Sequence, residues 1–166
     1  MPFLFPDAET AAEVLDSTGG EALNGVLAEL GLRGLAYGEL GFRYPTTSEG
    51  RAVTAPEDLE GLKIRTAGML EVSVAYVDCW GAELYPSSFL DVMTPLSAGY
   101  YDGQESTLAE ADAAGYQTVQ TDVTIFPAFY EPAILTMNSD LYDSLSPDLR
   151  EAVSYTHLRA HETLMN

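Results

Sequence analysis

Apolar residues recur at helical spacing in several stretches of the chain. The longest stretch covers residues 7–29, is interrupted at Gly19-Gly20, and reaches a natural end at Gly31. A single helical turn is expected at residues 55–59, where a proline follows a possible cap. Further helices are predicted at residues 69–80, from Ser87 or Ser88 to residue 98, at 106–114, and at 141–152.

Short apolar runs lie between these helices and have the length and composition of strands. They predict strands at residues 32–37, 62–66, 83–85, 119–126 and 131–137. Residues 46–51 are expected to form a polar loop, and Asp102-Gly103 a turn. Strands that alternate with helices predict an α/β protein.

The charge balance limits the partners that the chain can have. It holds 26 acidic residues against seven basic ones, a formal net charge of −19. Nucleic acid is therefore excluded as a partner, because its phosphates require clustered Lys and Arg. The sequence has no glycine-rich phosphate loop, CxxC motif or metal-spaced cluster, so we expect no cofactor and no metal site. The single cysteine, Cys79, lies in an apolar run and is expected to be a buried thiol.

The few cations are the most informative candidates for a binding site. Lys63, the only lysine, and Arg65 fall on one face of the strand at residues 62–66. Arg65 is the last charged residue before the chain turns at the carboxyl end of this strand. In α/β sheets the carboxyl ends of the strands face the crevice in which ligands bind. The Arg65 guanidinium could hold a carboxylate there through two parallel hydrogen bonds. An ion pair with Glu71 or Asp91 is the alternative. Lys63 is expected to be exposed, whereas Arg43 could also face a cleft.

Paired carboxylates offer an enzymatic alternative. Asp102 and Glu105 are three positions apart and could form the acid–base pair of a hydrolase. An Asp-Gly pair is a common turn, however, and accounts for Asp102 without catalysis.

Five ordered stretches carry a resemblance to a known family. They are GELGFR (38–43), APEDLEGLKIRT (55–66), GAELYPSSFLDVM (81–93), YDGQES (101–106) and ILTMNSDLYDSLSPDLREAV (134–153). In this order and spacing, they resemble the solute-binding subunit of tripartite ATP-independent periplasmic (TRAP) transporters, of the dicarboxylate-binding (DctP) type. The resemblance implies a two-lobed α/β fold like that of periplasmic binding proteins, present here as one nearly complete lobe plus part of the other.

The resemblance also implies ligand-binding residues. The arginine of the KIRT strand grips the ligand carboxylate in the family, and here it is Arg65. Arg43, after Gly-Phe, is expected to assist, and Phe89 occupies the place of an aromatic residue that packs on the ligand. Ser106 stands where the family often has Asn, and its hydroxyl can donate one hydrogen bond.

Function, location and boundaries follow from the same resemblance. It implies a periplasmic protein, not an enzyme, that captures an organic acid and delivers it to the membrane subunits of a TRAP transporter. A ligand-sensing domain of the same fold is the alternative. Residues 1–39 and 132–153 would belong to lobe I and residues 40–131 to lobe II, with a signal peptide and other segments missing from the chain.

The C-terminal end reads differently from the rest. Residues 153–163, VSYTHLRAHET, resemble the translation of a sequencing-library adapter and contain both histidines, His157 and His161. We therefore expect residues 154–166 to be a non-native tail.

Overall fold

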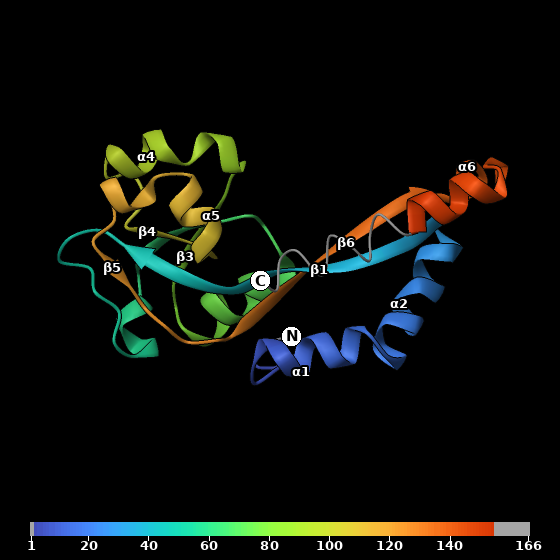
Figure 1. Ribbon diagram of the computed structural model, residues 1–166. Coiled ribbons are helices and arrows are strands. Elements are labelled where there is room, and N and C mark those ends of the chain that lie inside the picture. Colours follow the sequence, from blue (N-terminus) through green and yellow to red (C-terminus); the bar gives the residue numbers. More distant parts are fainter. Residues whose placement is uncertain (1, 155–166) are drawn as a thin grey trace. The chain divides into compact units, whose positions relative to one another are not determined.

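The computed structural model describes residues 2–154, apart from the side chains of residues 70 and 71 (Figure 1). The expected non-native tail thus lies almost wholly outside the described residues. Strands and helices alternate along the chain, which confirms the α/β class. The contacts divide the chain into two compact units. Unit 1 contains the residues up to Ala8 and Gly41–Glu131, and unit 2 contains Glu9–Leu40 and the residues from Pro132 onward.

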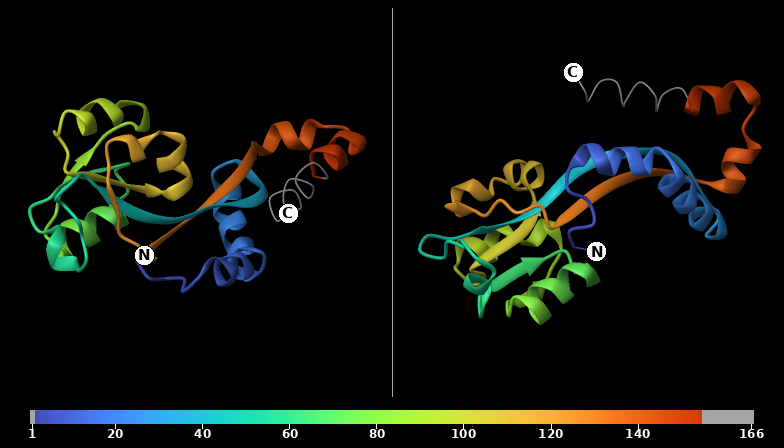
Figure 2. Two further views of the ribbon diagram at one scale, coloured as in Figure 1. Left: turned by 60° about the vertical axis from the view of Figure 1, so that its left-hand side comes forward. Right: turned by 90° about the horizontal axis from the view of Figure 1, so that it is seen from below.

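A mixed sheet forms the centre of unit 1. Its strands are ordered β3 (Glu83–Pro86), β2 (Lys63–Thr66), β4 (Gly103–Thr107), β1 (Leu32–Thr47) and β5 (Asp122–Val123), and β6 (Phe129–Asn138) also pairs with β1. Strand β2 is parallel to β3 and β4, whereas β1 is antiparallel to β4 and β5. Figure 2 shows β1 and β6 side by side.

Helices cover both faces of the sheet in unit 1 (Figure 1). The helical segments are η1 (Pro56–Leu59), α3 (Leu70–Ser73), the π-helical η2 (Val74–Cys79), η3 (Phe89–Asp91), α4 (Met93–Ser97), α5 (Leu108–Ala113) and η4 (Tyr116–Thr118). One apolar core lies around Ile64 and Tyr76, under η2. The other lies around Val92 and Tyr116, under α4 and α5.

Unit 2 consists of helices and the outer parts of the two long strands. Helices α1 (Ala8–Leu15), α2 (Thr18–Glu29) and α6 (Ser139–Ser144) belong to it, and residues 147–154 are helical. Gly31 adopts the left-handed conformation expected at a helix end, with φ of 72°. The interruption expected at Gly19-Gly20 falls instead at residues 16–17. Both glycines lie inside α2, where a Cβ on Gly20 would come within 3.1 Å of the Tyr37 ring.

Strand β4 was missed by the sequence analysis, which predicted a turn and then a helix from residue 106. All five residues of β4 are buried although none has a large apolar side chain, so no apolar pattern marks the strand. Gly103 is required because a Cβ there would lie 2.4 Å from the Thr46 carbonyl oxygen. The helix begins later, at Leu108, after Thr107 accepts a hydrogen bond from the Glu110 amide (3.2 Å).

Three other expectations were also wrong. Strand β1 continues to Thr47 through the expected loop, because the side chains of Thr46 and Thr47 are buried against β4 and β5. Of the strand expected at residues 119–126, only Asp122–Val123 pairs with β1. Cys79 is exposed rather than buried, since it ends the π-helical turn.

Candidate functional site

A row of four side chains crosses the sheet of unit 1. The register pairs Arg65 with Tyr85 on β3 and with Gln104 on β4, and pairs Gln104 with Thr46 on β1. Residues paired across neighbouring strands point to the same face of a sheet. This face is the one covered by α4 and α5, since Tyr85 packs against their core. Lys63, by contrast, is exposed as predicted.

Arg65 is buried and held in place by one residue. Its side chain is only 2% exposed. Its Nε donates to the Ser87 hydroxyl (3.3 Å), and its Nη2 donates to the Ser87 carbonyl. Ser87 is itself fixed, because its amide donates to the Thr66 carbonyl at 3.1 Å. A guanidinium has five N–H donors, so both N–H groups of Nη1 and one of Nη2 have no acceptor among the described side chains and remain for another one.

No carboxylate neutralises Arg65 among the side chains that the structure describes. The ion pair with Asp91 that the sequence allowed does not form, and the Glu71 side chain lies outside the described residues. Burial lowers the pKa of Arg65 from its ordinary value, but Tyr116 and Glu105 nearby oppose this shift. An arginine guanidinium is not deprotonated in proteins, so Arg65 remains charged at neutral pH.

Arg43 differs from Arg65 because its charge is already compensated. Its Nε donates to Glu105 Oε2 (2.6 Å), its Nη2 donates to Glu105 Oε1 (3.1 Å), and its Nη1 donates to Glu131. Burial alone would lower the pKa of Arg43, but the carboxylates of Glu105 and Glu131 raise it above its ordinary value. A further acidic side chain, Glu110, lies 3.7 Å from Nη1. A direct contact between Arg43 and a ligand therefore stays a prediction.

The two carboxylates of the hydrolase alternative have other partners. Glu105 is fully buried, where it pairs with Arg43 and accepts a hydrogen bond from Thr66 (2.8 Å). Asp102 accepts from the Lys63 amide (2.9 Å) and lies 3.3 Å from Arg51. Each acid thus has a structural role, and the geometry does not favour a catalytic pair.

Phe89 and Ser106, the other predicted site residues, lie in two different settings. Phe89 begins η3, is 41% exposed, and its ring lies 6.1 Å from that of Tyr116. Ser106 is buried in β4, and its hydroxyl donates to the Thr107 carbonyl (3.1 Å). Phe89 is therefore accessible to a ligand, whereas the Ser106 hydroxyl already has an acceptor.

Three residues of this neighbourhood were missed by the sequence analysis: Ser87, Gln104 and Tyr116. Ser87 was considered only as a helix cap, a role that Ser88 fills by accepting from the Leu90 amide. Gln104 belongs to the missed strand, and Tyr116 follows the left-handed Gly115 between the helix expected at residues 106–114 and the strand expected at 119–126. Only the register of β4 could have revealed Gln104.

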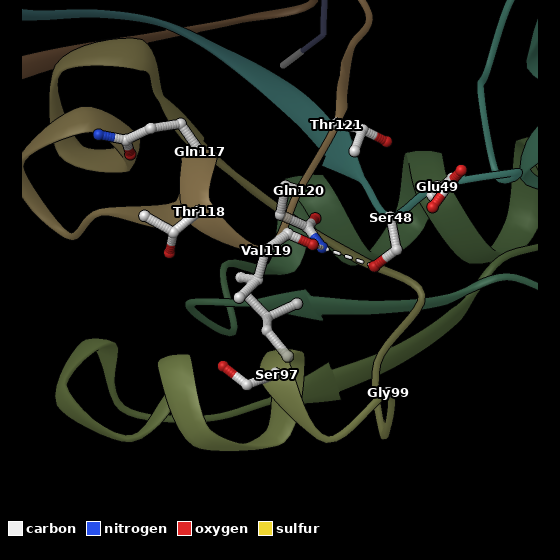
Figure 3. Close-up of a pocket in the computed structure, with 10 residues that line it drawn as sticks. Ser48, Glu49, Ser97, Gly99, Gln117, Thr118, Val119, Gln120 and Thr121 are labelled. Carbon is white, nitrogen blue, oxygen red and sulfur yellow. Dashed lines mark hydrogen bonds between the residues drawn. The ribbon is translucent and has the colours of Figure 1, made fainter.

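A pocket of about 440 Å³ lies in unit 1 away from Arg65 (Figure 3). Residues 48–49, the end of α4 and residues 117–121 line it, at the amino-terminal end of β4. Hydrogen bonds connect its wall to the row on the sheet: Gln104 donates to Thr46 (2.8 Å), Thr46 to Gln120 (3.3 Å), and Gln120 to Ser48 (2.8 Å). Arg65 is not among its lining residues, so this pocket is not the carboxylate site.

The described residues contain neither a metal-binding cluster nor a membrane-spanning helix. No group of three or more His, Cys, Asp or Glu side chains is placed to hold a metal ion in the part of the chain that the structure describes. Within the same residues, no helix has the length and apolar character needed to cross a membrane.

Comparisons with known proteins agree on one family. The family model described as bacterial extracellular solute-binding protein, family 7 (DctP), matches residues 1–166. A solute-binding protein of Verminephrobacter eiseniae is 39% identical over 145 residues, which are 87% of this chain and 43% of that protein. The 2,3-diketo-L-gulonate-binding periplasmic protein of Escherichia coli is 35% identical over 153 residues, which are 92% of this chain and 46% of that protein.

Solved structures give the same result. A TRAP periplasmic solute-binding protein from Polaromonas sp. JS666, bound to D-erythronate, superposes with a TM-score of 0.88 at 32% sequence identity. The match covers 96% of this chain and 52% of that one. The chain thus spans about half the length of the relatives it matches. These relatives are solute-binding proteins rather than enzymes.

Proposed function

Because the chain belongs to family 7 of the bacterial extracellular solute-binding proteins, we propose that it captures an organic acid through the carboxylate and delivers it to a TRAP-type transporter. Its membership of the family confirms the resemblance carried by the five sequence stretches. In this proposal the chain acts by binding and not by catalysis, in the periplasm, with the membrane subunits of the transporter as its partners.

One observation carries the proposal: Arg65 is a buried cation without a described counter-ion. The buried charges of the described residues are Arg43, Arg65 and Glu105, and Glu105 pairs with Arg43. An uncompensated buried charge is costly, and an anionic ligand would relieve that cost. The strongly negative protein cannot attract an anion through its overall field, so a local, fixed cation is needed.

The geometry suits a carboxylate. Ser87 holds the Nε and Nη2 side of the guanidinium, which leaves Nη1 and the remaining Nη2 donor as a parallel pair. Two parallel N–H donors match the two oxygens of a carboxylate. In this proposal Phe89 packs on the ligand, Ser106 adds at most one hydrogen bond, and Arg43 acts mainly by holding Glu105.

Titration calorimetry on the protein encoded by the whole gene tests the role of Arg65. With D-erythronate and succinate as probes, Arg65→Ala should weaken binding by about 2–5 kcal/mol, or about 30- to 5000-fold. Arg65→Lys should also bind poorly, because an ammonium cannot form the parallel pair. Arg51→Ala is the matched control, since Arg51 is 55% exposed and its charge pairs with Asp102. Unchanged affinity in both Arg65 variants would reject the proposal.

We further propose that the chain contributes to two lobes that close on the ligand, with lobe I formed by residues 1–39 and 132–153 and lobe II by residues 40–131. Units 2 and 1 follow this division to within one residue, except at the amino-terminal end, where the residues up to Ala8 belong to unit 1. A ligand that contacts both lobes would shift a hinge equilibrium toward the closed state. Small-angle scattering of the whole gene product should then show a smaller radius of gyration at saturating ligand. An unchanged radius would contradict closure without affecting the role of Arg65.

A further inference from the structure

Two buried polar atoms in the neighbourhood of Arg65 lack hydrogen-bond partners among the described residues. They are Gln104 Oε1 and the Tyr116 hydroxyl. Gln104 is fully buried and Tyr116 is 1% exposed, so bulk water does not reach them in this state. Leaving such atoms unpaired destabilises a protein, and native structures contain few of them. Two of them near a buried cation that has no counter-ion among the described side chains therefore require a physical explanation.

The Gln104 carbonyl is held in a fixed orientation beside Arg65. Gln104 is the register partner of Arg65, and neighbouring strands are about 4.8 Å apart. Its Nε2 donates to Thr46 Oγ1 on β1 at 2.8 Å. The two amide atoms diverge from one carbon, so this bond leaves Oε1 facing away from Thr46. The result is a preoriented acceptor on the side of Gln104 that faces β2, the strand of Arg65.

Tyr116 approaches the same place from the covering layer. Its ring contacts Phe89, and its backbone carbonyl is fixed by the amides of Val119 (2.9 Å) and Gln120 (2.8 Å). Burial raises the pKa of Tyr116, while the charge of Arg65 opposes this shift. The hydroxyl therefore remains protonated and can both donate and accept a hydrogen bond.

We propose that Gln104 and Tyr116 make the site selective for carboxylates with a neighbouring hydroxyl, that is, 2-hydroxy acids and polyhydroxy acids. This inference rests on the proposed role of Arg65. Arg65 binds the carboxylate, Gln104 Oε1 accepts the hydrogen of the adjacent hydroxyl, and the Tyr116 hydroxyl bonds to the same ligand oxygen. A ligand that lacks the hydroxyl leaves both protein atoms unpaired, which is the basis of strong discrimination by polar sites.

The third unpaired atom, Thr47 Oγ1, provides a matched control. Thr47 pairs with Gly103, where an added Cβ would meet both Thr47 Cγ2 (2.9 Å) and Ile64 Cδ1 (3.1 Å). Thr47 therefore faces the Ile64 core on the opposite side of the sheet. Thr47→Val removes a buried unpaired oxygen just as Tyr116→Phe does, but not at the proposed site.

The test uses matched acids that differ by one hydroxyl, titrated into the whole gene product: each enantiomer of malate against succinate, and of 2-hydroxybutanoate against butanoate. The wild-type protein should bind one enantiomer of the hydroxy acid about tenfold more tightly than the matched acid that lacks the hydroxyl. Tyr116→Phe and Gln104→Met should each reduce this ratio toward one, mainly by weakening the hydroxy acid. Thr47→Val should leave the ratio unchanged. Tyr116→Phe breaks no hydrogen bond between described residues, so it stays informative if Gln104→Met fails to fold.

The outcomes separate this inference from the proposed function. Equal affinities within each pair, or a preference that survives Tyr116→Phe, would overturn the selective role while leaving the Arg65 site intact. A ratio that falls equally in Thr47→Val would also overturn it, because the effect would then not depend on the site. Failure of all the acids to bind, or binding that Arg65→Ala does not weaken, would reject the proposed function itself.

Discussion

Glu105 is expected to contribute more to stability than Asp102, the other carboxylate near the ends of β4, and Glu105→Gln tests this. Its carboxylate accepts from Arg43 at 2.6 and 3.1 Å and from Thr66 at 2.8 Å, without solvent exposure. The substitution preserves volume but turns an amide N–H group toward the donors of Arg43. Breaking a buried ion pair costs about 3–5 kcal/mol, and the lower end applies because Glu131 still pairs with Arg43. We expect a loss of about 3 kcal/mol.

Urea denaturation of the whole gene product measures this loss as a change in the free energy of unfolding. Asp102→Asn is the matched control, because Asp102 pairs with the largely exposed Arg51 and an amide oxygen can still accept from Lys63. It should cost no more than about 1 kcal/mol. An Arg43→Gln and Glu105→Gln double variant should lose less than the sum of its single variants. A cost for Glu105→Gln no greater than that for Asp102→Asn would refute the reasoning.

Two further predictions concern local structure. Asp58 accepts hydrogen bonds from the amide and hydroxyl of Thr54, and these lower the pKa of Asp58 below 3.8. The stabilisation that the Asp58 carboxylate provides is therefore complete above pH 3.8 and is lost as the pH falls through the lowered pKa of Asp58. Asp58→Asn should destabilise the protein at pH 7 and progressively less in acid. Thermal unfolding measured across this pH range checks the difference. Gly103→Ala should destabilise by about 3 kcal/mol, because its methyl group would meet the backbone of β1. Gly25→Ala is the control, because a Cβ at this position in α2 would meet no other atom, and it should stabilise the protein by about 0.5–1 kcal/mol in urea denaturation. Equal effects of Gly103→Ala and Gly25→Ala would contradict the packing argument.

Local sequence patterns predicted the elements whose burial follows from their own residues. The strand containing Arg65 could be predicted because Leu62 and Ile64 alternate with charged residues and Gly61 ends the preceding turn. Alternation accounts for the burial of Leu62 and Ile64 on one face, whereas Lys63 and Arg65 share the other face and are distinguished by the position of Arg65 nearer the carboxyl end of the strand. The sequence could therefore indicate which cation enters the interior.

Contacts between distant residues could not be predicted in the same way. Arg43 and Glu105 are 62 positions apart, and Arg65 and Ser87 are 22 apart, so no local spacing brings either pair together. Strand β4 is buried because β1 and β2 flank it, while its own composition is polar. Without β4, the position of Gln104 beside Arg65 could not be deduced.

The contact between Arg43 and Glu131 has a mechanical consequence. Glu131 is the last residue of unit 1 on β6, and Arg43 lies just inside the same boundary on β1. The ion pair therefore clamps the two long strands together at the rim of unit 1. Separating β1 from β6 at this point would break the ion pair of a buried arginine, so these two segments are expected to move together.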